Sequence, residues 1–375
     1  MILRGGSGLE LFEIVFEIRS PAIVTKRLTR RGYHIPLDHI PASMLRGALI
    51  SSLYMKNLIS NEYLEREAHS PSIITSPAYP MDEEGKSYPA HPFIYECKIP
   101  HEKGVQTYND GRKVLKNVRN GLPLRLRQLC DLGHPALESL HPRLLIPLKE
   151  SFKKFELRIQ QSVNVGISKH RATSHRGMLF EYEAIAEGTK FWSNICIPEE
   201  LIDEVKPGFE FSIGRGISRG FGRAVIVDVR EIDIDDESED YIGILKNGRK
   251  IVFYALSNLL SIQGGNNSSK YPDEIKLKPI GEKFNLNVNG KIILEEVYGK
   301  IVTFHSGWDI KKNMERPSVL ATSRGSIVIG NVSGNGELSK TLAILGCIGT
   351  VEYGLDFNIT GVNILIPLEI HPMVG

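Results

Sequence analysis

The chain has few cysteines and almost no excess of charge. Its cysteines, Cys97, Cys130, Cys196 and Cys347, include no pair at C-x-x-C spacing, which argues against a zinc ribbon, a disulfide framework or a dithiol redox site. We expect them to be small buried hydrophobic residues. The 46 lysines and arginines nearly balance the 44 aspartates and glutamates, which leaves a formal net charge of +2. Any nucleic-acid site must therefore come from local clusters of basic residues.

The sequence also lacks the signals that direct a chain to a membrane. No apolar run approaches the length of a membrane span, and the first residues have neither the basic nor the apolar region of a signal peptide. These absences predict a cytoplasmic protein without a membrane partner. No H-E-x-x-H motif occurs, and no cluster of Asp, Glu and His indicates a metal, so we expect no metal or other cofactor.

The chain is long and rich in glycine. Its 375 residues, 41% of them hydrophobic, suffice for two packed domains. Alternating apolar and acidic residues predict a strand over Leu9 to Ile18, and apolar residues at helical spacing predict a helix that Ser43 caps. The order strand, helix or loop, strands, helix, glycine loop, strand occurs twice. This order favours an α+β fold of two related β-α-β-β-α-β units.

Composition suggests where the domains divide. Residues 1–232 form the first domain, and the proline-rich stretch at about 70–147 is too long for a structureless loop, so we interpret it as an inserted lobe. The acidic run at 233–246 is most simply a solvated linker. Residues 247–375 form the second domain.

Three basic segments are candidates for binding an anion. One precedes the first helix, one lies at its start, where free backbone N–H groups and the helix dipole favour a phosphate, and one lies in a Ser/Thr-containing loop. Their candidate residues are Lys26, Arg27, Arg30, Arg31 and His34; Ser43, Arg46 and Gly47; and Lys169, His170, Arg171 and Arg176. Each segment has a simpler interpretation as a solvated surface.

The segment 214–223 carries the most specific pattern. It interleaves glycines, arginines and one aromatic residue, which suits phosphate binding and base stacking: Gly214, Arg215, Gly216, Arg219, Gly220, Phe221, Gly222 and Arg223. It departs from G-x-G-x-x-G and lacks the Walker A lysine. The G-x-S-x-G string at 216–220 needs a following helix to form a hydrolase elbow, whereas a strand is expected here. A glycine-rich hairpin without function is the simpler alternative.

Three segments, in order, resemble CRISPR-associated RAMP proteins. Residues 40–49, IPASMLRGAL, look like the I-P-G-S-x-L-R-G helix start, with Ala42 in place of glycine; residues 171–191 look like the following strand pair; and residues 214–223 look like the G-R-G-x-x-R-G-F-G-R loop. Ser76–Pro80 and Pro89–Pro92 resemble the proline-rich insertion of the type III-D subunit that caps the guide RNA at its 5′ handle. Gly307-Trp308, Arg316-Pro317 and Gly325-Ser326 stand where such subunits carry similar pairs.

The resemblance implies two ferredoxin-like domains, the second degenerate because the loop at 349–357 lacks the family's arginines. It implies a non-catalytic subunit that binds the 5′ handle of a processed CRISPR RNA and scaffolds an antiviral type III effector. The implied partners are the CRISPR RNA, the large signature subunit, adjacent backbone RAMP subunits and, indirectly, target RNA.

Two enzymatic alternatives stay open. A metal-independent endoribonuclease that processes precursor CRISPR RNA would use His34, His170 or His175 as acid or base, because a neutral imidazole can accept a 2′-hydroxyl proton near pH 7. A backbone subunit that cleaves target RNA would use a loop aspartate, for which Asp38 is the candidate. No G-G-D-D motif and no H-D dipeptide occur, which disfavours the polymerase-like large subunit.

Overall fold

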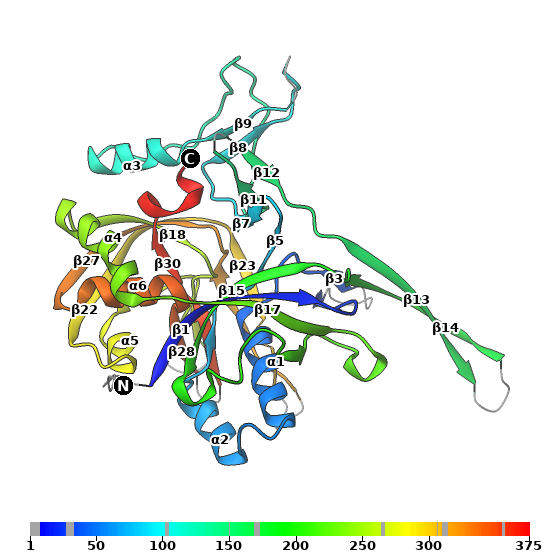
Figure 1. Ribbon diagram of the computed structural model, residues 1–375. Helices are drawn as coiled ribbons and strands as arrows, with labels where there is room; N and C mark the ends of the chain where they lie inside the picture. Colours follow the sequence, from blue (N-terminus) through cyan, green and yellow to red (C-terminus); the bar gives the residue numbers. More distant parts are fainter. Residues whose placement is uncertain are drawn as a thin grey trace.

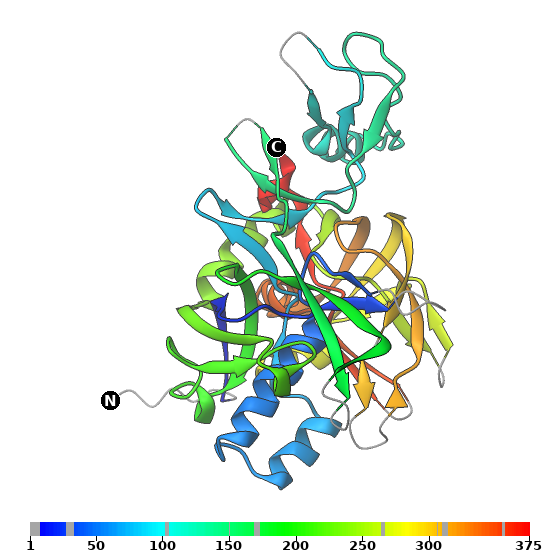
Figure 2. The same cartoon turned by 90° about the vertical axis from the view of Figure 1, so that its right-hand side faces the viewer.

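The computed structural model describes residues 8–27, 34–101, 105–149, 151–168, 173–263, 267–305, 307–309, 314–354 and 357–375. Two antiparallel sheets with helices packed against them form its body, and a lobe and a long hairpin extend from that body (Figures 1 and 2).

The first sheet is built around the predicted N-terminal strand. Alternation makes β1 (Leu9–Ile18) amphipathic, so Ile14, Phe16 and Ile18 are fully buried. The sheet order is β16-β17-β1-β15-β5-β6, with β4 beside β15. The other strands are β4 (Ile74–Thr75), β5 (Tyr79–Asp82), β6 (Gly85–Lys86), β15 (Lys190–Pro198), β16 (Glu210–Ser212) and β17 (Arg223–Glu231).

Helix α1 (Ala42–Met55) covers one face of this sheet. Its Leu45 and Leu49 join a core cluster with Ile14 and Phe16. Helix α2 (Asn61–His69) follows, and Ser60 caps it through a hydrogen bond that Tyr63 N–H donates to Ser60 Oγ, 3.2 Å. Figure 1 shows both helices beneath the sheet.

The second sheet has the order β21-β22-β27-β18-β30. Its strands are β18 (Lys250–Ala255), β21 (Glu274–Lys276), β22 (Val288–Tyr298), β27 (Ile327–Gly336) and β30 (Leu365–Pro367). The helices α4 (Ile234–Asn247), α5 (Lys278–Lys283) and α6 (Leu338–Ile348) belong to its core cluster. That cluster also takes in Leu11, Ile74 and Cys196 of the first sheet, so the two halves of the chain share packed surface.

The lobe combines two small sheets with one helix. The sheets are β7-β11-β12 and β10-β8-β9, built from β7 (Tyr88–Pro89), β8 (Ile94–Cys97), β9 (Thr107–Asn109), β10 (Leu137–Ser139), β11 (Leu144–Pro147) and β12 (Phe152–Lys154). Helix α3 (Gly111–Arg119) lies close to the C-terminus (Figure 1). From the lobe the chain enters the hairpin of β13 (Ile159–Ser168) and β14 (Thr173–Ile185), which projects from the body (Figure 1).

The remaining elements are short. The strands are β2 (Thr25–Arg27), β3 (His34–Pro36), β19 (Ser261–Gln263), β20 (Asn267–Ser269), β23 (Ile301–His305), β24 (Trp308–Asp309), β25 (Met314–Glu315), β26 (Ser318–Thr322), β28 (Thr350–Tyr353) and β29 (Asn358–Val362). The 3-10 helices are η1 (Glu199–Leu201), η2 (Ile217–Arg219), η3 (Leu368–Ile370) and η4 (Pro372–Val374).

The mixed architecture of helices and antiparallel strands agrees with the α+β expectation. In the part of the chain that the structure describes, no helix is both long and apolar enough to cross a membrane.

The structure corrects three details of the sequence prediction. Ser43 is not the N-cap, because α1 begins at Ala42 behind Pro41 and has no side-chain cap. The stretch 70–147 is not all lobe, because β4 and β5 within it pair with β15. The acidic run at 233–246 is not simply a solvated connection: most of it forms α4, whose Tyr241 and Ile244 are buried in the second core. The proposed domain boundaries themselves remain a prediction.

Candidate nucleic-acid interface

The glycine-rich segment forms a tight loop between β16 and β17. Its four glycines, Gly214, Gly216, Gly220 and Gly222, all have φ between +76° and +87°, where L side chains are strained. Two of them also lie against backbone: a Cβ on Gly214 would lie 2.6 Å from the Ile23 carbonyl oxygen, and one on Gly222 would lie 2.0 Å from that of Ile213. The fold itself therefore requires these glycines.

The loop presents cations beside an aromatic pair. Arg219 Nη1 donates a hydrogen bond of 2.7 Å to Tyr182 Oη, and the guanidinium carbon lies 4.9 Å from the centre of the Tyr182 ring. The Tyr182 and Phe221 rings are 6.1 Å apart. Arg215 and Arg219 are exposed and Phe221 is half-buried. An arginine over one aromatic ring, with a second ring beside it, offers flat faces for stacking a base and a cation for its phosphate.

Arg223, at the start of β17, helps to hold the loop. Its backbone N–H donates to Ser20 Oγ, 2.9 Å, and its carbonyl accepts from Arg19 N–H, 2.7 Å. Its exposed guanidinium faces Glu210 at 3.3 Å. Because both side chains of that pair are about 60% exposed, at 63% and 60%, water screens the pair and leaves the cation accessible to a stronger anion.

Two of the other basic segments lie next to this loop. Arg215 forms an isolated antiparallel β-bridge with Ile23, two residues before β2 begins. Strand β2 carries Lys26 and Arg27 and pairs with β3, where His34 lies. Strand β3 in turn contacts β14, the strand of His175 and Arg176. The candidates Arg30, Arg31, Lys169, His170 and Arg171 lie outside the described residues. The structure thus brings the β2–β3 and β13–β14 hairpins to the glycine loop at the level of the backbone.

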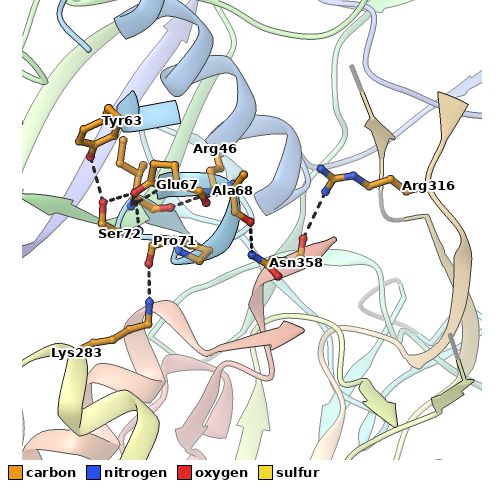
Figure 3. Close-up of polar contacts among 10 residues, drawn as sticks. Arg46, Tyr63, Glu67, Ala68, Pro71, Ser72, Lys283, Arg316 and Asn358 are labelled. Atoms are coloured by element: carbon orange, nitrogen blue, oxygen red, sulfur yellow. Dashed lines mark hydrogen bonds and ion pairs between the residues drawn. The ribbon is translucent and has the colours of Figure 1, made fainter. Parts of the chain in front are cut away.

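Arg46 does not face this surface. Its Nε donates to the Ile73 carbonyl, 2.7 Å, and its Nη2 lies 2.7 Å from Glu67 Oε2 and 3.1 Å from the Glu67 carbonyl (Figure 3). Its side chain is 19% exposed and that of Glu67 is 2% exposed. Arg46 therefore has an internal partner, since the buried carboxylate of Glu67 needs its charge inside the protein, and a contact of Arg46 with a phosphate stays a prediction.

The same network ties α1 and α2 to the second half of the chain. Lys283 donates to the Pro71 carbonyl, 2.5 Å, while Asn358 donates to the Ala68 carbonyl and accepts from Arg316 (Figure 3). At the start of α1, Gly361 of β29 approaches Ala42 so closely that a Cβ on the glycine would lie 2.6 Å from that of Ala42. The helix start is therefore a packed contact. Gly47, further along α1, is open, with no atom within 4 Å of its Cβ position.

Asp38 is engaged in an ion pair with the second half of the chain. Its two carboxylate oxygens accept from Arg324 Nη2 at 2.7 and 2.6 Å, and Oδ1 also accepts from His39 Nδ1 at 2.9 Å. Burial would raise the pKa of Asp38, but Arg324 and His39 hold that pKa well below its usual range. A carboxylate held in this way serves structure and is poorly suited to act as a cleavage base.

A shallow groove of about 470 Å³ lies beside Asp38. Leu157, Gln161 and Glu183 line it together with Asp38. Because it presents two carboxylates, it disfavours a phosphate, and we place the candidate interface at the glycine loop.

One cluster of cysteines and histidines in the lobe was not among the expected sites. All four cysteines are buried and unpaired, as expected for small hydrophobic residues, but Cys97 and Cys130 gather with His101 and His134. The available signal was a repeated spacing, Cys-x-x-x-His, at both positions. Neither the C-x-x-C pattern nor a His/carboxylate pattern detects this spacing.

Comparisons with known proteins bear on the family. A family model described as the RAMP superfamily matches residues 3–225. A chain of the type III-B Cmr-beta complex bound to cognate target RNA is similar at 13% identity and a TM-score of 0.48, over 84% of this chain and 86% of that chain. Cmr4 from Pyrococcus furiosus is similar at 11% identity and a TM-score of 0.28, over 60% of this chain and 99% of that chain. No curated protein sequence matches the chain.

The family match covers α1, most of the first sheet and the three elements of the candidate interface, which are the β2–β3 hairpin, the β13–β14 hairpin and the glycine loop. Because the match spans more than half of the chain, the protein belongs to the RAMP superfamily.

Proposed function

We propose that this protein is a non-catalytic RNA-binding subunit of a type III CRISPR effector complex, in which it holds the 5′ handle of the CRISPR RNA. The observation that carries the proposal is the glycine loop. Four left-handed glycines fix an exposed turn that presents Arg215 to solvent and places Arg219 against Tyr182 of the Tyr182–Phe221 pair. Phosphate contacts from the arginines would position the RNA, and the aromatic pair would stack one of its bases.

The strand orders support a ferredoxin-like interpretation of both halves. The series β17-β1-β15-β5 in one sheet and β22-β27-β18-β30 in the other places the first strand of each unit between its third and fourth. All neighbouring strands in both series run antiparallel. A β-α-β-β-α-β unit produces this arrangement when its crossovers are right-handed.

The proposals for the handle and the partner subunits are based on the motifs that resemble the type III-D capping subunit. The proline-rich residues of that resemblance lie in and beside the lobe, whose surface lies away from the glycine loop (Figure 1). We propose the lobe and the second domain as docking surfaces for the large subunit and the adjacent backbone subunits, which would meet target RNA.

A non-catalytic role is favoured over cleavage of target RNA because Asp38 is paired with Arg324. The nuclease alternative that uses His34, His170 or His175 is tested by incubating the protein with precursor CRISPR RNA. We expect the RNA to remain intact, with and without EDTA. Cleavage that a His34/His170/His175→Ala triple variant loses would replace this proposal.

Binding experiments test the role of the loop. The anisotropy of a labelled CRISPR RNA, with its repeat-derived 5′ segment, is measured with the full chain at several salt concentrations. We expect Arg215→Ala to weaken binding and to reduce the slope of log K against log [salt] by about 0.7 for each lost phosphate contact. The control is Arg66→Ala, which removes a cation of 60% exposure on α2, outside the interface.

Two outcomes would contradict the proposal in different ways. Unchanged affinity and slope in an Arg215→Ala, Arg219→Ala double variant would exclude the glycine loop as the RNA site. Equal affinity for RNA with and without the repeat-derived segment would exclude the handle as the preferred ligand while leaving RNA binding intact.

A further inference from the structure

A second site lies in the lobe. Cys97 ends β8, and His101 follows it by four residues; Cys130 and His134 have the same spacing in the connection before β10. Strands β8 and β10 pair antiparallel with Cys97 opposite Leu137, and this register brings the 130–134 turn back to the end of β8. Two sequence-distant Cys-x-x-x-His segments therefore converge.

The ligand atoms of the four residues form a compact group. One atom from each of Cys97, His101, Cys130 and His134 lies within 4.8 Å of all the others, and Cys97 Sγ is 3.7 Å from His134 Nδ1. Zn–S and Zn–N bonds of about 2.3 and 2.0 Å give tetrahedron edges of roughly 3.3 to 3.8 Å. The sulfur–nitrogen contact already has this length, and the longest separation needs only about 1 Å of side-chain adjustment.

Hydrogen bonding around the cluster also indicates a missing ligand. His101 Nε2 is buried and has no hydrogen-bond partner. A buried polar nitrogen in this state costs free energy unless it binds a ligand. The backbone N–H of His134 also donates to Cys130 Sγ at 3.3 Å. Such outer hydrogen bonds hold the ligands of a metal site in position.

The backbone around the cluster has no regular secondary structure on one side. From Asn120 to Ala136 the chain has neither helix nor strand, and it exposes Leu122, Leu126, Leu129 and Leu132. Stretches of this length without secondary structure are uncommon in a compact protein, and those that occur are often functional. The turn that ends it is tight: Gly133 has φ +77°, and its N–H donates to the Cys130 carbonyl at 2.9 Å.

We propose that Cys97, His101, Cys130 and His134 bind one structural Zn²⁺ ion, which links the end of β8 to the 130–134 turn. Four protein ligands complete a tetrahedral shell, so no position is left for water, and the ion serves stability. Two thiolates and two imidazoles favour zinc over magnesium or calcium, which prefer oxygen ligands. This site is independent of the proposed RNA-binding role, because its residues lie in the lobe, outside the glycine loop and hairpins.

The other two cysteines provide matched controls. Burial raises the pKa of Cys196 and that of Cys347 to about 12, so these thiols stay protonated, and neither belongs to the group of potential ligands. Cys97→Ala and Cys130→Ala remove one ligand each. Cys196→Ala and Cys347→Ala remove an equally buried thiol from elsewhere in the chain.

The test measures zinc in the full chain, prepared without a histidine tag from zinc-supplemented cells. We expect about one zinc per chain by elemental mass spectrometry in the wild type and both controls, and a loss of most of it in Cys97→Ala and Cys130→Ala. Added Co²⁺ should give thiolate charge-transfer and tetrahedral d–d bands in the zinc-depleted wild type but not in the ligand variants.

A measurement on the wild type tests the proposal even if the ligand variants fail to fold. A chelator should release the zinc into a colorimetric assay and lower the melting temperature, and added Zn²⁺ should restore it. Wild-type protein that carries no zinc and shows no cobalt spectrum would overturn the proposal. So would a Cys97–Cys130 disulfide in freshly prepared protein, or zinc content that is equal in ligand and control variants.

Discussion

At the residue scale, several side chains that a sequence would assign to ligand binding serve the interior instead. Arg46 follows a helix start and is basic, which favours a phosphate contact on pattern alone. What the pattern omits is Glu67, a carboxylate on another helix that folding leaves 2% exposed. The pairing of two distant residues is a tertiary property, so no local motif predicts it.

This pair gives the first prediction. Arg46→Ala leaves the Glu67 carboxylate buried without its partner, so we expect the free energy of unfolding to fall by about 3–5 kcal/mol. Urea denaturation measures it. Arg66→Ala, which breaks the exposed pair with Glu200, should change stability by less than about 0.5 kcal/mol. A neutral effect of Arg46→Ala on stability, with loss of RNA affinity, would restore Arg46 as a phosphate ligand.

Buried histidines give a second prediction. Burial lowers the pKa of His91 and that of His141 to about 4, although each also hydrogen-bonds a backbone carbonyl. His141 Nδ1 donates to the Ala90 carbonyl at 2.8 Å, so Nε2 is left to accept from Ser323 Oγ, which requires a neutral ring.

Between pH 6.5 and about 4 the unfolded chain therefore binds protons that the folded chain does not. We expect the free energy of unfolding to decrease as the pH is lowered through this window, by up to about 1.4 kcal/mol per pH unit for each histidine. Urea denaturation at a series of pH values checks this, and His141→Gln should make the dependence less steep. Stability that is flat from pH 6.5 to 4.5 would show that these rings are not buried in neutral form.

At the element scale, local patterns predicted the elements whose periodicity is strong. The strand over Leu9–Ile18 has the expected bounds, because every second residue faces one core. The acidic run before residue 247 does not predict α4 from its composition, because charged residues dominate it. The helix packs on the core through Tyr241 and Ile244, which lie three residues apart. The lobe boundary was missed because β4 and β5 are too short to show alternation.

The glycine loop is the element most open to test. Gly222→Ala places a Cβ 2.0 Å from the Ile213 carbonyl oxygen at a φ of +77°, so the loop must distort. We expect a loss of about 1–3 kcal/mol in stability, together with weaker RNA binding. The control is Gly47→Ala in α1, where the Cβ meets no atom within 4 Å and helix propensity should stabilise the chain by up to about 1 kcal/mol. Equal stability effects of the two substitutions would contradict the loop geometry.

At the scale of the whole molecule, the last residues join the lobe to the second sheet. Met373 is fully buried, and its carbonyl accepts hydrogen bonds from His91 Nε2 at 3.0 Å and Asn109 Nδ2 at 3.1 Å. Its side chain packs in a cluster with Phe93 of the lobe and Tyr254 of β18. No local pattern indicates this contact, because it joins residues nearly three hundred positions apart.

We therefore expect Met373→Ala to cost about 2–5 kcal/mol through the cavity that it leaves in this cluster. Thermal unfolding of the full chain measures it. Met55→Ala, at a methionine that is 78% exposed at the end of α1, should leave the melting temperature within about 2 °C. Similar effects at the two methionines would mean that the C-terminal residues do not join the lobe to the sheet.

The central claim concerns what the whole molecule binds. Its most direct test is to isolate the protein from its native cells at low salt and to sequence the RNA that accompanies it, with 5′ ends resolved. We expect RNAs that share one short repeat-derived 5′ segment joined to varied spacers, and a large reduction in their yield with Arg215→Ala, Arg219→Ala protein. Recovery of no such RNA, or of RNAs with random 5′ ends, would contradict it.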